Sequence, residues 1–227
     1  MNKVKKLGLV FLSTFALVAG SYAKSFTDNE MGYNYYKGNN GYEVNTSKAL
    51  DYFEKSANSG NADSQYISGI MYLQGRGVRV DHAKGLKYLQ QSAEQNYGVA
   101  LFSIGIIYEQ GKILPLNKKL SLEYLEKAAK NGYKSSGFYV GYKYFIGDNV
   151  EKSYKKSIEY YDISLQDSLL KDSQIGQIYK NKATMYFKGG YGLEKDLDKA
   201  NWFADLALSK GIDLINLKLD IVSEKNK

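Results

Sequence analysis

Apolar, small and polar positions repeat along the chain with a period of about 36 residues. A tyrosine followed three residues later by a glycine recurs at intervals of 37, 36, 36 and 42 residues, at Tyr35, Tyr72, Tyr108, Tyr144 and Tyr186. A phosphate-binding loop is a single site, whereas a structural turn can recur in every repeat. The glycine-rich segment after Tyr72 is therefore interpreted as a turn, and the chain as an array of similar units.

The first half of each unit has the pattern of a helix that packs closely on a neighbour. A small residue lies three positions before each of these tyrosines: Gly32, Gly69, Gly105, Gly141 and Ala183. Residues three apart share a helical face. Because glycine inside a helix costs about 1 kcal/mol relative to alanine, its recurrence here predicts the close approach of a second helix.

The second half of each unit predicts an amphipathic helix. Residues that accept hydrogen bonds from free backbone amides recur at 36-residue steps and predict the N-caps: Asn45, Asp81, Asn117 and Ser153. All five units then carry an aromatic-apolar pair: Tyr52-Phe53, Tyr88-Leu89, Tyr124-Leu125, Tyr160-Tyr161 and Trp202-Phe203. A small residue follows four positions after the pair, at Ala57, Ala93, Ala129 and Ala207, with Leu165 as the exception. Gly60 and Gly132 are predicted to end their helices. The spacing places these side chains on one buried stripe, so we expect an all-α fold of about five helix pairs.

The segment Tyr72-Leu73-Gln74-Gly75-Arg76-Gly77-Val78, with Asp81, Lys84 and Ala93 after it, resembles the Sel-like repeat (SLR), a relative of the tetratricopeptide repeat. The resemblance covers about Gly32 to Gly211. It implies a right-handed α-solenoid (superhelix) of antiparallel helix pairs, with a concave face lined by the first helix of each pair. The sequence departs from the family pattern at Lys112-Ile113 and Asp148-Asn149, where a second glycine is expected, and by an insertion around Gln166 to Gln174. Different turns are therefore expected in these two loops.

The chain is expected to have three parts. Residues 1–23 have a basic start, an apolar stretch of about 13 residues from Leu7 to Ala19, and a small-x-small ending at Ser21-Tyr22-Ala23. This is the pattern of a cleaved signal peptide, because a membrane-spanning helix needs about 20 apolar residues. Residues 24–211 form the solenoid, with repeats near 25–61, 62–97, 98–133, 134–175 and 176–211, and residues 212–227 a C-terminal capping helix with a charged tail. A periplasmic or secreted bacterial protein is expected.

Composition narrows the chemistry. The 227 residues include 44% apolar residues, a single proline and no cysteine, so one folded body is expected without disulfides, thiol catalysis or zinc-thiolate sites. Loss of Lys3, Lys5 and Lys6 with the signal peptide lowers the formal net charge from +7 to +4, without a tight cluster of Lys and Arg. No nucleic-acid partner, metal or cofactor is expected.

Candidates for catalysis have structural interpretations. His82, the only histidine, directly follows the N-cap Asp81 and is interpreted as a surface residue. Two Ser-x-x-Lys matches are similar to a motif of penicillin-recognising hydrolases, but the companion motifs Ser-Asp-Asn and Lys-Thr-Gly are missing. Paired carboxylates are interpreted as solvated helix surface, because acid-base chemistry needs carboxylates in unlike, partly desolvated environments. These matches and pairs are Ser153 with Lys156, Ser168 with Lys171, Asp51 with Glu54, and Asp196 with Asp198. The chain is not expected to be an enzyme.

The candidate binding residues are aromatic and apolar side chains on the first helices. By the resemblance they face the concave groove, and exposed aromatic clusters often mark binding surfaces. Tyr66, Phe102 and Phe138 belong to a column that is often partly buried in the family, so core and groove both stay open for them. The predicted groove residues are Tyr33, Tyr36, Tyr66, Ile70, Phe102, Ile106, Phe138, Tyr142, Phe145 and Phe187.

Three functions fit this pattern. The favoured one is a non-catalytic extracytoplasmic scaffold that binds a peptide or protein in the concave groove, and the resemblance implies envelope, signalling or host-interaction (virulence) roles. The alternative is a peptidoglycan- or glycan-binding modulator of cell-wall enzymes, because rows of aromatic side chains stack on sugars. The third is a penicillin-recognising hydrolase.

Overall fold

The computed structural model describes residues 26–227, which form eleven helices and one isolated β-bridge between Gly190 and Leu193. The all-α class is confirmed. The expected signal peptide and its cleavage site lie outside the described residues. No helix between residues 26 and 227 combines the length and the apolar character that crossing a lipid bilayer requires.

The helices follow one another without an intervening domain. Their bounds are α2 (Asp28–Lys37), α3 (Thr46–Asn58), α4 (Ala62–Gln74), α5 (His82–Glu94), α6 (Gly98–Gln110), α7 (Lys118–Lys130), α8 (Ser136–Ile146), α9 (Tyr154–Ser164), α10 (Asp172–Lys188), α11 (Leu197–Ser209) and α12 (Ile215–Lys225).

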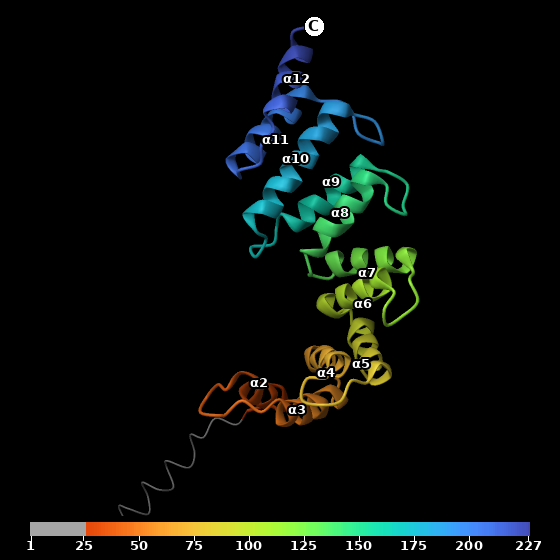
Figure 1. The fold of residues 1–227 in the computed structure, drawn as a ribbon, viewed down its shortest axis with the longest axis vertical. Helices are drawn as coiled ribbons and strands as arrows, with labels where there is room; N and C mark the ends of the chain where they lie inside the picture. The colour runs from red at the N-terminus through yellow and green to blue at the C-terminus, as the bar shows by residue number, and fades with distance from the viewer. Residues whose placement is uncertain (1–25) are drawn as a thin grey trace, which may run out of the picture.

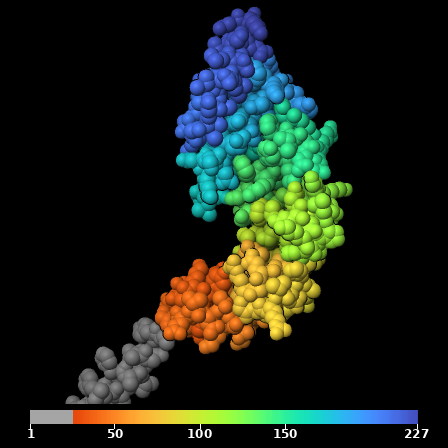
Figure 2. All heavy atoms as spheres, viewed as in Figure 1, coloured from red at the N-terminus to blue at the C-terminus, as the bar shows by residue number. Residues whose placement is uncertain are grey.

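Consecutive helices pack as pairs, from α2 with α3 to α10 with α11, and each pair stacks on the next to form a helical solenoid (Figure 1). Helix α12 packs on α11 at the C-terminal end. The body is long and bent, and the space-filling view shows a hollow inside the bend, between the orange N-terminal helices and the cyan part of the chain (Figure 2). Helices α4 and α6 border the hollow side (Figure 1).

The glycine column marks the line where the two helices of a pair touch, as predicted. A Cβ atom on Gly32 or Gly141 would lie 2.6 Å from a ring carbon of Phe53 or Tyr161, which is closer than real Cβ contacts. The same relation joins Gly69 to Leu89 and Gly105 to Leu125, at 2.9 and 3.0 Å. In every case the neighbour is the second member of the aromatic-apolar pair in the same repeat.

The predicted N-caps are confirmed. Their side chains accept a hydrogen bond from the backbone N–H three residues on, at 2.9 to 3.3 Å: Asn45, Asp81, Asn117 and Ser153, together with Asp196. Gly60 and Gly132 lie two residues beyond the ends of α3 and α7, with φ values of +92° and +90°. A left-handed residue at this place turns the chain out of the helix without a Cβ clash.

The loops between the paired helices use a left-handed residue two positions after the repeat glycine. Gly77 has φ +73°, and Asn149 keeps the same region with φ +57°. Ile113, by contrast, does not adopt a positive φ. The difference follows from the side chains, because asparagine tolerates this region and a β-branched residue does not. Only the Ile113 loop therefore turns differently from the family pattern in this respect.

The insertion around Gln166 to Gln174 lengthens a helix and reshapes the loop before it. Helix α10 has 17 residues, whereas α4, α5, α6 and α7 have 13. In the preceding loop Leu170 is buried and packs in a cluster with Tyr154, Tyr161 and Ile178. The inserted residues therefore join the core between α9 and α10.

A carboxylate links the first repeat to the second. The hydroxyl groups of Tyr72 and Tyr88 donate to Oε1 of Glu54 at 2.9 and 3.1 Å, and Nζ of Lys84 lies 2.6 Å from the same oxygen. The two tyrosine rings stack with centroids 6.2 Å apart. Burial raises the pKa of Glu54, but hydrogen bonds from Lys84 and Tyr72 outweigh it and hold this pKa below its ordinary value.

The same joint recurs between the third and fourth repeats. The hydroxyl of Tyr144 donates to Oε1 of Glu126 at 2.6 Å, and its ring stacks on Tyr160 at 5.9 Å. Nζ of Lys156 lies 4.9 Å from the centre of the Tyr144 ring, in the place that Lys84 takes in the second repeat. The recurrent tyrosine therefore joins one repeat to its predecessor.

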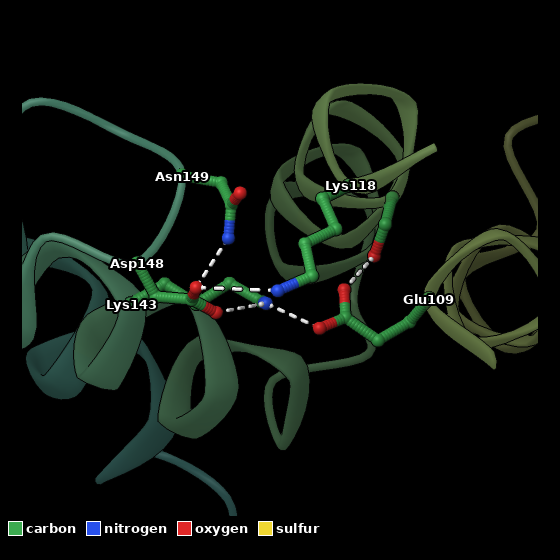
Figure 3. A network of polar contacts seen from close by, with 6 residues as sticks. Glu109, Lys118, Lys143, Asp148 and Asn149 are labelled. Carbon is green, nitrogen blue, oxygen red and sulfur yellow. Dashed lines mark hydrogen bonds and ion pairs between the residues drawn. The ribbon is translucent and has the colours of Figure 1, made fainter. Parts of the chain in front are cut away.

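A second polar network uses the loop that lacks the family glycine (Figure 3). Nζ of the buried Lys143 lies 2.8 Å from Oε1 of Glu109 and 3.2 Å from Oδ2 of Asp148, and Nζ of Lys118 lies 3.6 Å from the other Asp148 oxygen. Asn149 donates to Asp148. A buried ammonium group is tolerated only when it is paired in this way. The Asp148-Asn149 departure thus supplies a partner for Lys143.

Candidate functional site

The predicted groove residues lie on the first helices of the five repeats. They are Tyr33 and Tyr36 on α2, Tyr66 and Ile70 on α4, Phe102 and Ile106 on α6, Phe138, Tyr142 and Phe145 on α8, and Phe187 on α10. Tyr142 is an exposed side chain, and the other nine are half-buried. The structure brings eight of them together in two groups and leaves Ile106 and Phe187 outside both.

The first group forms a pocket between α2 and α4, which we call the N-terminal pocket. Its walls are the rings of Tyr33, Tyr36 and Tyr66, and the cavity has a volume of about 220 Å³. The remaining lining residues are Ile67, Ile70, Met71 and Arg76. Four of the predicted residues therefore share one cavity, with an arginine at its edge.

One carboxylate holds the tyrosines of this region in place. Asp63 accepts hydrogen bonds from the hydroxyls of Tyr33 at 2.9 Å and Tyr97 at 2.8 Å, and from Nδ2 of Asn29 at 3.4 Å. Burial and the bond to Asp63 raise the pKa of both tyrosines far above the ordinary value. The hydroxyls therefore stay protonated at any physiological pH and act as donors.

The second group is a row of rings on α6 and α8, which we call the central aromatic row. The centroid of the Tyr139 ring lies 5.5 Å from that of Phe102 and 5.8 Å from that of Phe138. The ring centroids of Tyr142 and Phe145 are 6.5 Å apart. Tyr139 and Tyr142 are 44% and 45% exposed. Because Tyr139 and Tyr142 lie three residues apart on α8, their rings share one solvent-exposed face of the helix.

The remaining predicted residues are partly used by the core. Phe145 stacks on the buried ring of Tyr154 at 5.9 Å, which takes up one of its faces. Ile106 packs against the cluster that contains Leu125 and Val140. Phe187 packs at the edge of the C-terminal core, and Nζ of Lys195 lies 5.5 Å above its ring.

Sequence reasoning missed Tyr139 and Arg76. Tyr139 could have been found from the three-residue spacing to Tyr142, which continues the same stripe one turn toward the N-terminus. Arg76 lies between two turn glycines, and nothing in the repeat pattern indicates that it reaches Tyr36 of the preceding repeat.

The residues considered for catalysis have the surroundings expected of structural groups. His82 is exposed on the first turn of α5, and the Ser153 hydroxyl caps α9 by accepting from the Lys156 amide at 3.3 Å. Ser168 and Lys171 are both exposed. Among residues 26–227, no three His, Cys, Asp or Glu side chains are arranged to hold a metal ion.

Comparisons with known proteins agree on the repeat. The sequence matches the Sel1 repeat over residues 28–61, 62–97, 98–133, 138–165 and 183–212. No curated protein matches it significantly. A Sel1 repeat protein from Oxalobacter formigenes has a similar fold, with a TM-score of 0.65 and 24% identity over 82% of this chain and 72% of that one.

A second solved structure with this fold is c5321, described as a protective antigen of uropathogenic Escherichia coli strains displaying an SLR fold. It has a TM-score of 0.57 and 24% identity over 86% of this chain, which spans 48% of the E. coli chain. Sel1 repeats generally act as scaffolds for protein-protein interaction and are generally non-catalytic. With five matched repeats, stacked helix pairs and the glycine and N-cap columns in place, the chain belongs to the Sel1 repeat family.

Proposed function

We propose that the protein is a non-catalytic scaffold of the bacterial envelope that binds a protein or peptide along the first helices of its repeats. The observation that carries the proposal is the exposure of Tyr139 and Tyr142, which are 44% and 45% exposed beside the half-buried Phe102 and Phe145. Rigid aromatic side chains at a surface are the usual anchors of protein interfaces. They contribute little to the core here and are free to contact a partner.

The test compares two variants with the wild-type protein. Replacing Tyr139 and Tyr142 together with alanine removes the exposed rings, while Trp202→Ala removes a ring that is 57% exposed on a second helix, α11. Envelope proteins captured by the wild-type protein are identified, and their affinities for all three proteins are measured. Circular dichroism melts establish that each variant is folded.

We expect the double variant to bind the captured partner at least about tenfold more weakly, because aromatic anchors commonly carry about 2 kcal/mol or more. The Trp202→Ala variant should bind as the wild-type protein does. Equal affinity for all three proteins, or weaker binding by Trp202→Ala alone, would show that the central aromatic row is not part of the interface.

The location outside the cytoplasm is part of the proposal. It is supported by the basic, apolar and small-residue segments of residues 1–23, and by the lack of cysteine, which leaves no thiol to oxidise. Protein purified from the periplasm or medium should begin at Lys24. Intact-mass measurement tests this, and extracytoplasmic protein that keeps Met1 would contradict it.

A further inference from the structure

We propose that the N-terminal pocket binds one apolar side chain of an acidic segment in the protein partner, whose carboxylate pairs with Arg76. This inference rests on the proposed scaffold function and specifies the chemistry of the partner at one place. The central aromatic row lies on α6 and α8, so the two sites can be tested separately.

The size of the pocket fits a side chain. Its volume of about 220 Å³ exceeds the roughly 150 Å³ of a cavity that admits benzene. It is smaller than the roughly 300–1,000 Å³ of sites for drug-sized molecules. Apolar Ile67, Ile70 and Met71 together with three tyrosine rings line the space, so burial there favours an apolar or aromatic group.

The positive charge of Arg76 at the edge of the pocket favours an acidic residue next to the bound apolar side chain of the partner. Among residues 26–227, no carboxylate lies within ion-pair distance of Arg76, whose Nη1 donates instead to the hydroxyl of Tyr36 at 2.5 Å. This bond holds the guanidinium group beside the tyrosine ring and leaves its other N–H groups available. A guanidinium group presents these donors in a planar fork that matches a carboxylate.

A second cation lies on the same side. Nζ of the exposed Lys37 is 5.0 Å from the centre of the Tyr33 ring. Lys37 is the last residue of α2 and Arg76 lies two residues beyond the end of α4, whereas Asp63 lies at the N-terminal end of α4, where tyrosine hydroxyls donate to it. The surface around the pocket is therefore basic near Arg76 and acidic near Asp63, and this polarity favours an acidic segment whose carboxylate faces Arg76.

The experiment uses two matched peptides as probes, acetyl-Phe-Glu-amide and acetyl-Phe-Gln-amide, on the full mature protein. Met71, at the floor of the pocket and nearly fully buried, carries a methyl group whose NMR signal reports occupancy directly. Each peptide is titrated into wild-type protein, Arg76→Gln and Arg79→Gln. Arg79 is the matched control, because it is an exposed arginine of the same loop that does not line the pocket.

We expect both peptides to shift the Met71 methyl signal, and the glutamate peptide to bind wild-type protein about three- to tenfold more tightly. The preference should disappear in Arg76→Gln, persist in Arg79→Gln and weaken as salt is added. No shift with either peptide would overturn the pocket as a site. Equal affinities, or a preference that survives Arg76→Gln, would overturn the role of Arg76.

Two further measurements distinguish this inference from the scaffold proposal and from the binding of a small acid. The double variant Tyr139→Ala, Tyr142→Ala keeps the pocket, so it should bind the glutamate peptide as wild type does even if the scaffold test fails. Phenylacetate carries the same ring and carboxylate without a peptide backbone. If it bound more tightly than the glutamate peptide, the site would be one for a small acid and the assignment to a protein segment would be wrong.

Discussion

Gly141 shows how one residue sets the distance between two helices. Its missing side chain leaves room for the Tyr161 ring, which is fully buried and whose hydroxyl accepts from Nδ2 of Asn181 at 2.7 Å. A shift of this ring would strain that bond. The glycine of the third repeat faces a more adaptable neighbour, because Gly105 meets the branched end of the Leu125 side chain.

The two glycines should therefore respond differently to alanine. Gly141→Ala places a methyl group where a ring carbon is only 2.6 Å away, so overpacking of about 1–3 kcal/mol should outweigh the roughly 1 kcal/mol that alanine gains in a helix. Gly105→Ala, with its nearest contact at 3.0 Å, should change the free energy of unfolding less. Urea unfolding of both variants measures this. A Gly141→Ala protein as stable as Gly105→Ala would show that the ring is free to shift.

At the scale of helices, the joint built on Glu54 also connects stability to pH. The folded state holds the pKa of this carboxyl below its ordinary value, so the ionised form stabilises the fold above the unfolded pKa. The contribution is lost as pH falls through the folded pKa, in acid below about pH 4.5. Other carboxyls titrate in the same range, so a variant is needed to isolate this one.

The Glu54→Gln variant provides that comparison. It keeps the size of the side chain and removes the charge that Lys84 pairs with, so its melting temperature should lie below that of wild type at pH 7. The difference should shrink as both proteins are taken from pH 6 to pH 3, because wild-type Glu54 becomes protonated too. Melts monitored by circular dichroism at each pH test this. A difference that stays constant across the range would show that the charge does not stabilise the joint.

The repeat pattern also explains why the ionic link is missing between the second and third repeats. The position 36 residues after Glu54 is Gln90, and the one after Lys84 is Leu120, so the joint between the second and third repeats has neither charge. The rings of Tyr108 and Tyr124 still stack there, at 5.9 Å. A cavity of about 150 Å³ lies beside them, lined in part by Gln90.

At the scale of the whole molecule, the fold could be predicted because its signals are local and repeated. The glycine column, the N-caps and the aromatic pairs each recur five times or nearly so, and each acts within one helix pair. The surroundings of the candidate binding residues were harder to predict. The half-buried state of Phe145 depends on Tyr154 in the next helix, and the reach of Arg76 to Tyr36 depends on how two repeats stack. Such contacts between units are not visible in the pattern of one unit.

The stacking of each pair on the next has a mechanical consequence. A force applied to the two ends acts equally on every joint between repeats. The weakest joint therefore opens first. The joint beside Gln90 lacks the ionic link, so we expect it to open first. A repeat of about 36 residues that opens there releases about 120 Å of chain, since a stretched residue spans roughly 3.3–3.6 Å. A partner held at the N-terminal pocket would then be tethered to the C-terminal repeats by an extensible connection rather than by a rigid rod.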